Sequence, residues 1–353
     1  MYCYRIMLLD AMCFVLVFIV IFSFLLFDTG SSGNKVGLYV TQSTSLMQWG
    51  IRHSCEVANQ LISVDRIIEY TDLESERQLK KTKSQMTQSW PSDGRIEFRN
   101  VTYKYAYEIE PVLHQISFKV LPRNKICVVG RTGAGKSSII GALFRMAHVK
   151  VLIEIDGVDT STIELNLLRS KISIIPQQPF LFSGTLRQNQ DPFNQYTDDE
   201  IYNALDDIKM RHIVSGNQGP DLTVLANGGN FSNGQRQILC LARAILKKNT
   251  ILVLDEATAN VNAQTDEIIQ QTIRSKFANC TVFAIAHRLN TIIDYNRGLV
   301  IDGGRSVEYD TPYNLLTKPT GYFNEMVQAL GHKEFDRFLE IAKSRNAFEV
   351  INS

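Results

Sequence analysis

A glycine-rich segment at residues 130–137 carries the residue types that bind phosphate groups. Its sequence, GRTGAGKS, fits the pattern G-x-x-x-x-G-K-[ST] in full. The glycines let backbone N–H groups point at phosphate oxygens. Lys136 can then reach the β- and γ-phosphates, and the Ser137 hydroxyl can ligate Mg²⁺. The predicted phosphate-binding residues are Gly130, Arg131, Thr132, Gly133, Ala134, Gly135, Lys136, Ser137 and Ser138.

Two elements must hold this loop in place. Residues 125–129 are apolar and β-rich, which predicts a buried strand, and residues 138–144 predict the first turns of a helix. Strand, glycine loop and helix in this order form an anion site, because a helix N-terminus carries partial positive charge. A glycine turn without a ligand is the alternative, and the Lys136-Ser137 pair argues against it.

Two adjacent carboxylates, Asp255 and Glu256, close a second apolar segment at residues 250–254. An all-apolar strand of this kind fits the centre of a parallel sheet that is covered on both faces. Open α/β sheets place ligands at the carboxyl ends of their strands, so we expect Asp255 to hold Mg²⁺ through water. Glu256 is a candidate general base for the water that attacks the γ-phosphate, a role worth about 10²- to 10⁴-fold in rate. An ordinary acid at a strand end is the alternative for Glu256.

Residues 231–237 predict the start of an amphipathic helix, because Ser232 and Gln235 have capping-box spacing. A serine hydroxyl and free N–H groups at a helix start can also bind an anion. The position of this segment between the glycine loop and the acid pair resembles the ATP-binding cassette (ABC) family. In that comparison Phe231 to Gln235 stands where the family has its signature motif, and the resemblance assigns Ser232, Gly234 and Gln235 to ATP.

Three further positions match the ABC pattern in chain order. Residues 174–179 resemble the Q-loop, in which Gln177 contacts Mg²⁺ or water and senses the membrane domain. Residues 284–288 resemble the switch region, so His287 would hydrogen-bond the γ-phosphate and hold Glu256. Taken alone, His287 would more often be a core or surface histidine.

An aromatic side chain before the glycine loop is expected to stack on adenine, and the resemblance selects Tyr105. Such stacking is worth about 1–3 kcal/mol. Tyr103 and Tyr107 are rivals, because one strand would present all three tyrosines on the same face.

Residues 174–193 and 252–294 are more specifically similar to the second nucleotide-binding domain of subfamily C exporters, the multidrug-resistance-associated proteins. Glu256 implies a catalytically competent site, since first domains of that subfamily often have Asp there. Two positions depart from the superfamily pattern. Asn233 replaces a signature glycine, and Asn262 replaces the usual Asp of the D-loop, which keeps an acceptor and loses the charge.

Composition excludes several other classes. The net charge of the 353-residue chain is +1, which gives no electrostatic case for nucleic acid. The six cysteines and six histidines show neither disulfide nor metal-ligand spacing and fit reduced, cytosolic thiols.

The N-terminal region differs in kind. Residues 11–27 contain no charge, and a spanning helix over about 7–27 is predicted at the short end of the required length. A signal peptide is a rival, but no small-residue cleavage site follows Phe27; a buried soluble helix is another. Residues 36–50 stand where the family has its last spanning helix, but they are polar and short. Residues 51–70 have the spacing of an amphipathic helix.

The predicted organisation is therefore α/β: a P-loop NTPase cassette preceded by a transmembrane helical fragment. The cassette should have a parallel core sheet, an antiparallel β subdomain and a helical signature subdomain. The predicted parts are a membrane-domain fragment (1–72), a linker (73–95), the nucleotide-binding domain (96–330) and a helical tail (331–353). The tail has an apolar stripe at Phe335, Phe338, Leu339 and Ala342 that should pack on the domain.

The resemblance implies an ATPase that uses ATP and Mg²⁺ to drive export of organic anions or drug-like compounds. Such cassettes work in pairs, in which the loop at Gly130 to Ser138 faces the signature of a second nucleotide-binding domain across ATP. That partner would be the missing half of the same protein or another copy. The remaining substrate path would lie in membrane helices that the chain lacks, and Met1 would mark a truncated start. The implied location is the plasma membrane, with the nucleotide domain cytosolic.

Two other functions are compatible with the sequence. One is a regulatory nucleotide-binding module that hydrolyses little ATP because of Asn233 and Asn262. The other is a soluble ABC ATPase without a membrane part.

Overall fold

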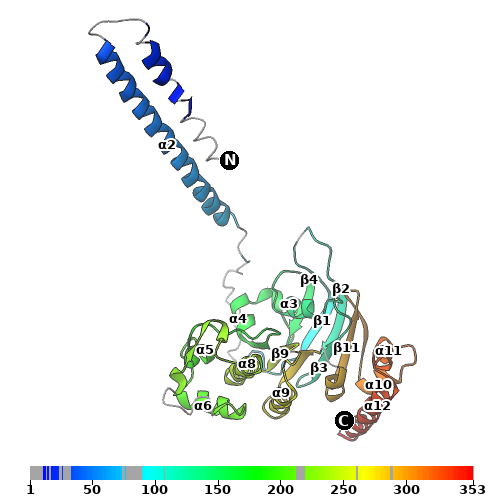
Figure 1. Ribbon diagram of the computed structural model, residues 1–353. Coiled ribbons are helices and arrows are strands. Elements are labelled where there is room, and N and C mark those ends of the chain that lie inside the picture. Colours follow the sequence, from blue (N-terminus) through cyan, green and yellow to red (C-terminus); the bar gives the residue numbers. More distant parts are fainter. Residues whose placement is uncertain are drawn as a thin grey trace. The chain divides into compact units, whose positions relative to one another are not determined.

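The computed structural model describes residues 11–12, 14–15, 17–23, 26, 33–73, 76, 90–106, 108–211, 219–259, 261–286 and 289–352. The chain divides into two compact units, Met1–Arg77 and Gln78–Ser353. Figure 1 shows the helices and strands of both. Each unit is described by itself.

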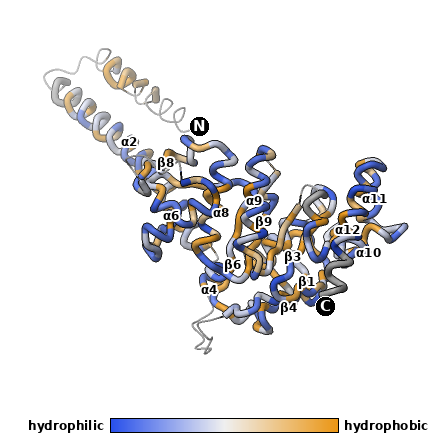
Figure 2. Tube along the Cα trace, turned by 90° about the horizontal axis from the view of Figure 1, so that it is seen from below, coloured by the Kyte–Doolittle hydropathy of each residue, from blue (hydrophilic) through white to orange (hydrophobic). Residues whose placement is uncertain are grey.

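The first unit is dominated by one long helix, α2 (Gly33–Thr71). It runs without interruption through both segments that the sequence suggested as separate helices. Its polar residues use helix carbonyls: the Thr41 and Ser45 hydroxyls donate to the carbonyls of Gly37 (2.5 Å) and Thr41 (3.0 Å). Such bonds satisfy hydroxyl groups within a helix. Figure 2 shows polar and apolar residues mixed along α2.

The predicted membrane-spanning helix is not supported by the structure. Residues 17–23 are helical, whereas residues 7–10, 13, 16, 24, 25 and 27 lie outside the described ones. Within the described ranges, no helix combines the length and the apolar character that crossing a bilayer requires.

The second unit is built on two larger sheets and a short ribbon. The antiparallel sheet has the order β2-β1-β4-β5, and its strands are β1 (Ile96–Lys104), β2 (Leu113–Val120), β4 (His148–Ile155) and β5 (Val158–Asp159). The core sheet has the order β12-β11-β3-β10-β9-β6, and its strands are β3 (Lys125–Val129), β6 (Ile172–Ile175), β9 (Ile251–Asp255), β10 (Thr281–Ile285), β11 (Arg297–Asp302) and β12 (Arg305–Asp310). The ribbon pairs β7 (Gly184–Thr185) with β8 (Thr223–Val224).

Within the core sheet, β6, β9, β10, β3 and β11 are parallel and only β12 runs antiparallel to its neighbour. β9 lies between β10 and β6, and its first four residues are buried, as expected of an apolar strand covered on both faces. The predicted α/β class with a parallel core sheet and a separate antiparallel sheet is confirmed.

Helices surround these sheets (Figure 1). They are α3 (Lys136–Leu143), α4 (Leu165–Ser170), α5 (Leu186–Gln190), α6 (Asp198–Asp207), α8 (Asn233–Lys247), α9 (Ala263–Lys276), α10 (Pro312–Thr317), α11 (Tyr322–Gln328) and α12 (His332–Asn352). Four short 3₁₀ segments are η1 (Thr160–Thr162), η2 (Gly219–Asp221), η3 (Ala226–Gly228) and η4 (Leu289–Asp294).

Two apolar clusters form the core. One packs the antiparallel sheet against β3, β9 and α3, and includes Phe98, Ile126 and Phe283. The other packs the opposite side of the core sheet against α6, α8 and α9, and extends to α12 through Phe338 and Ala342. The predicted packing of the tail stripe on the domain is therefore confirmed.

Candidate functional site

The glycine loop lies between β3 and α3, and its conformation requires glycine at two points. Gly130 has φ +156°, and a Cβ there would stand 2.2 Å from the Ile301 carbonyl oxygen. Gly135, with φ +100°, directly precedes α3, and a Cβ there would stand 2.9 Å from a Leu113 methyl carbon. The loop is thus pressed against β11 on one side and the start of β2 on the other.

The Lys136 ammonium lies across this loop. Its Nζ donates to the carbonyl oxygens of Gly130 (3.0 Å) and Arg131 (3.2 Å). An ammonium group has three donors and no acceptor, so these bonds hold it at the mouth of the loop. An incoming phosphate oxygen would meet this charge together with the N–H groups at the start of α3.

The Ser137 hydroxyl meets the predicted metal-binding acid. Its Oγ donates to Oδ1 of Asp255 at 3.3 Å. Burial raises the pKa of the Asp255 carboxyl, with a further rise from the neighbouring Glu256 charge; the Ser137 bond and Lys136 oppose this. The two oxygens converge although they are far apart in the sequence, because β3 and β9 both flank β10 and end at the same edge of the sheet.

Glu256 stands just beyond β9 in a strained backbone conformation. Its φ is +47°, a left-handed value that is uncommon for a side chain other than glycine. Its N–H donates to the Ile285 carbonyl at 3.2 Å, and its own carbonyl accepts from Ala259 N–H at 3.0 Å. Non-glycine residues held this way cluster at functional sites.

Gln177 and Glu256 are brought into direct contact. The Gln177 Nε2 donates to Oε2 of Glu256 at 2.6 Å. Gln177 follows β6, which pairs with β9, so both residues leave neighbouring parallel strands at the same sheet edge. His287, which was predicted to hydrogen-bond the γ-phosphate and hold Glu256, lies outside the described residues. The preceding Ala286 donates its N–H to the Val128 carbonyl at 3.2 Å.

Of the two candidate tyrosines that the structure describes, Tyr105 is the one exposed to a ligand. Its side chain is 53% exposed, and its hydroxyl lies 3.0 Å from the Ser138 Oγ. Tyr103 has 0% exposure and belongs to the core. Tyr105 follows β1, which ends at Lys104, yet its ring lies edge-on to the Tyr103 ring with centroids 5.1 Å apart, as expected of side chains on the same face. Tyr107 lies outside the described residues.

The signature segment caps its own helix. Ser232 Oγ accepts from Gln235 N–H at 3.2 Å, and Ser232 N–H donates to Gln235 Oε1 at 2.8 Å. This is the predicted capping box at the start of α8. A Cβ on Gly234 would stand 2.9 Å from Thr265 Oγ1, so the signature packs against the first turn of α9. Ser232 and Gln235 thus bond each other. They do not join the hydrogen-bonded pairs that Ser137 forms with Asp255 and Gln177 with Glu256.

Comparison with known proteins agrees with this geometry. Residues 113–259 match the family model described as ABC transporter. This chain therefore carries an ABC transporter domain. It is 49% identical to ATP-binding cassette sub-family C member 4 of Mus musculus over 339 residues, which is 95% of this chain and 26% of that protein. The human protein of the same name gives the same identity and coverage.

Relatives from other organisms are also similar to most of this chain. The Drosophila melanogaster probable multidrug resistance-associated protein lethal(2)03659 is 44% identical over 95% of this chain and 25% of its own length. Metal resistance protein YCF1 of Saccharomyces cerevisiae is 44% identical over 85% of this chain and 20% of its own length. The chain spans about a quarter or less of the length of these relatives, and it resembles their nucleotide-binding part.

Asn262, which departs from the usual D-loop residue, has a structural role in the ABC domain. Its Oδ1 accepts from Thr265 N–H at 2.8 Å and so caps α9. Asn is among the preferred N-cap residues, which explains how the cap survives without the acid. Thr265 in turn is the neighbour of Gly234, so the D-loop cap and the signature share one contact residue.

Two polar residues that the sequence reasoning missed connect the signature helix to the Q-loop. Gln237, which is buried, donates Nε2 to the Pro176 carbonyl at 2.9 Å, next to Gln177. Arg243 donates to the carbonyls of Phe180 (2.8 Å) and Asn189 (2.7 Å), and burial lowers the pKa of its guanidinium. The sequence did contain a signal for these two bonds. Gln237 and Arg243 lie among apolar residues of the signature helix, and buried polar groups need hydrogen-bond partners.

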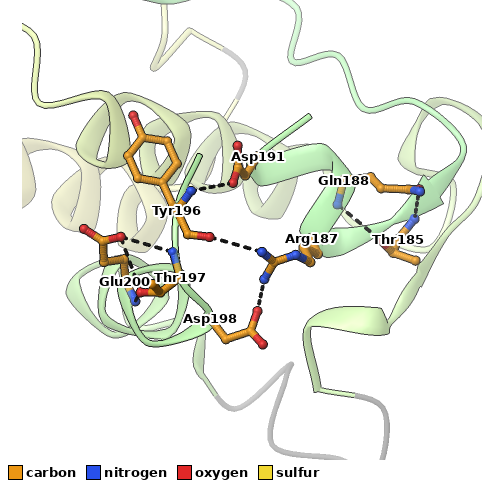
Figure 3. A network of polar contacts seen from close by, with 8 residues as sticks. All are labelled: Thr185, Arg187, Gln188, Asp191, Tyr196, Thr197, Asp198 and Glu200. Carbon is orange, nitrogen blue, oxygen red and sulfur yellow. Dashed lines mark hydrogen bonds and ion pairs between the residues drawn. The ribbon is translucent and has the colours of Figure 1, made fainter. Parts of the chain in front are cut away.

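The segment between Q-loop and signature is braced by a second polar network (Figure 3). Arg187 of α5 pairs with Asp198 of α6 and donates to the Tyr196 carbonyl at 3.1 Å. Asp191 accepts from Tyr196 N–H at 2.8 Å. Each helix also starts with a capping box, Thr185 with Gln188 and Thr197 with Glu200. The loop from α5 to α6 is thus fixed at both ends.

Proposed function

We propose that this chain binds ATP with Mg²⁺ and hydrolyses it to ADP and phosphate, as the nucleotide-binding part of a membrane exporter related to the multidrug-resistance-associated proteins. The observation that carries the proposal is the convergence of Ser137 on Asp255 and of Gln177 on Glu256 at one edge of the core sheet. The glycine loop and Lys136 open onto the same edge.

The residues fit both the nucleotide and the metal. The loop N–H groups, the start of α3 and Lys136 would hold the phosphates, and Tyr105 is exposed enough to stack on adenine. Ser137 and Asp255, with Gln177, offer the oxygen ligands that Mg²⁺ prefers beside phosphate oxygens and water. When bound, Mg²⁺ neutralises charge on the β- and γ-phosphate oxygens.

Glu256 would orient a water in line with the γ-phosphorus and take its proton as the oxygen–phosphorus bond forms and ADP leaves. For this the Gln177 amide must leave the Glu256 carboxylate, so Gln177 would couple metal binding to release of the base. His287 would support the γ-phosphate. Phosphoryl transfer depends mainly on such positioning and charge stabilisation.

A second nucleotide-binding domain would complete the site. Ser232, Gly234 and Gln235 lie at a separate helix start, so within this proposal they would close the ATP site of a partner, which is another copy or another half of a longer protein. The export substrates would be organic anions or drug-like compounds, handled by membrane helices. The N-terminal unit would belong to that membrane part, and the nucleotide domain would face the cytosol.

The test is the rate of ATP hydrolysis by the full chain. Glu256→Gln should lower it at least 100-fold, while Glu267→Gln, on the exposed face of α9, should leave it unchanged. An unchanged rate in Glu256→Gln would show that the base is assigned wrongly. Nucleotide binding without hydrolysis in the unmodified chain would favour a regulatory module instead.

Lys136→Ala provides an independent check on the phosphate site. It removes the ammonium group from the mouth of the loop and should sharply weaken binding of a fluorescent ATP analogue. Retained binding would contradict the assignment of the glycine loop.

A further inference from the structure

A cluster of cationic side chains lies at the edge of the core sheet opposite the acids. Lys125 begins β3, Arg274 is in the last turn of α9, and Arg345 belongs to α12. All three line one cavity of about 260 Å³, together with Asp294, Tyr295, Gln270 and Ile273. The cavity is therefore built by four segments that are distant in the sequence.

The cations outnumber the acids in this cavity. Asp294 Oδ2 lies 2.8 Å from Arg274 Nη2, and Asp294 Oδ1 lies 3.5 Å from Arg345 Nη1. Arg345 Nη1 also donates to the Ile293 carbonyl at 3.1 Å. One carboxylate thus serves two guanidinium groups. Three cations and one carboxylate leave a net charge of about two positive among the lining residues that the structure describes.

Of the three cations, Lys125 has its positive charge least neutralised by nearby carboxylates. Its backbone is fixed by Asn296, whose Oδ1 accepts from Lys125 N–H at 2.9 Å. Its ammonium has no carboxylate within ion-pair distance in the described part of the chain. Burial lowers the pKa of the Lys125 ammonium, and Arg345 and Arg274 lower it further, against the effects of Asp294 and Cys280. An additional negative group would relieve this repulsion.

We propose that this cavity is a binding site for a phosphate group, separate from the ATP site. A phosphate monoester carries about −1.5 to −2 charges at neutral pH. This charge balances the net positive charge of about two among the residues that line the cavity. Guanidinium groups bind such oxyanions in bidentate geometry, and the lysine adds a point charge. Asp294 competes with the ligand for both arginines. The phosphate would come either from free inorganic phosphate or from a phosphorylated side chain.

The experiment uses the full chain in detergent, with Lys136→Ala in every sample so that the glycine loop does not contribute. Isothermal titration calorimetry with inorganic phosphate should give saturable one-site binding. Arg274→Gln and Arg345→Gln should each weaken it about tenfold, as expected for a charge-assisted hydrogen bond. Arg337→Gln, on the same helix as Arg345 and 66% exposed, should have no effect.

Asp294→Asn gives the sharpest test because it acts in the opposite direction. Removing the competing carboxylate should tighten phosphate binding severalfold, whereas a purely structural role of Asp294 could only weaken it. Arg274→Gln, at a side chain that is 62% exposed, remains informative if the Arg345 variant does not fold. No saturable binding, equal loss with Arg337→Gln, or weaker binding with Asp294→Asn would each overturn the proposal.

The source of the phosphate follows from a second titration with O-phosphoserine. Binding at least as tight as that of inorganic phosphate supports a site for a phosphorylated side chain. Binding of inorganic phosphate alone supports a site for the free ion. The test does not depend on ATP hydrolysis, so it stands whether or not the proposed ATPase activity is found.

Discussion

The left-handed backbone of Glu256 leads to a prediction that separates stability from activity. At φ +47° a residue with a Cβ is strained, by about 1–2 kcal/mol on the scale of left-handed L-residues. Glycine escapes this strain but loses about 0.4–1 kcal/mol through the greater freedom of its unfolded chain. Glu256→Gly should therefore be more stable than Glu256→Ala by about 1 kcal/mol. Both variants lose the Gln177 hydrogen bond, so the comparison cancels it.

At the control position, Glu267, the stability difference between the Ala and Gly variants should have the opposite sign. Glu267 lies on the exposed face of α9 in ordinary helical geometry. There Ala should be more stable than Gly by about 0.5–1 kcal/mol, because glycine is unfavourable inside helices. The Ala–Gly difference at the two positions should thus have opposite signs.

Urea unfolding followed by tryptophan fluorescence measures this difference. The chain has two tryptophans, and Trp90, 7% exposed in the second unit, reports on the ABC domain. Trp49→Phe in all samples removes the other signal. Both Glu256 variants should also lose hydrolysis by about 10²- to 10⁴-fold. If Ala were as stable as Gly at 256, the strain at this residue would not exist in solution and the argument from it would fail.

Three further outcomes are expected at the same site. Asp255→Asn should raise the free energy of unfolding at pH 7 while abolishing hydrolysis. Burial raises the pKa of the Asp255 carboxyl above its ordinary 3.8. Its contribution to the free energy of unfolding therefore falls as pH rises from 3.8 through the folded pKa. Urea unfolding at pH 4 and pH 7 should accordingly show a smaller difference between the two pH values in Asp255→Asn than in the unmodified chain. Tyr105→Ala should weaken ATP binding by about 5- to 150-fold, the equivalent of 1–3 kcal/mol of stacking, whereas Tyr105→Phe should bind nearly normally in a fluorescence titration. Gly130→Ala should lower the free energy of unfolding by about 1–3 kcal/mol, because the new Cβ meets the Ile301 carbonyl at 2.2 Å; an unchanged urea midpoint would contradict the close packing of the loop on β11.

Local patterns in the sequence were sufficient for the elements that carry the site. The strand at 125–129, the glycine loop and the helix after it follow from residue types within one short segment. The same holds for the strand that ends at Asp255 and for the Ser232 cap of α8. In each case the signal and the structure lie within a few residues of each other, so no tertiary information was needed.

Features that depend on packing between distant segments could not be predicted in this way. Alternation placed Tyr103 and Tyr105 on one face, and their ring centroids do lie 5.1 Å apart, but the packing of distant segments around them decides that Tyr103 is buried and Tyr105 exposed. The bonds from Gln237 to Pro176 and from Gln177 to Glu256 join residues on different elements. Their partners are fixed by the order of strands in the sheet, which no single segment contains.

The site residues already have partners within the protein, and this affects how a nucleotide would bind. Lys136 donates to loop carbonyls, Ser137 to Asp255, and Gln177 to Glu256. A ligand would exchange these hydrogen bonds for new ones, so the net gain per contact is the difference between two bonds of similar kind. The ligand contacts add most where the internal partner is a poor match. Lys136 is such a case, because its ammonium exchanges neutral carbonyl oxygens for phosphate oxygens of opposite charge, which adds Coulomb attraction. The Gln177–Glu256 bond already pairs an amide with a carboxylate, so its opening has an energetic cost, and that cost would delay release of the base until the metal and phosphates engage Gln177.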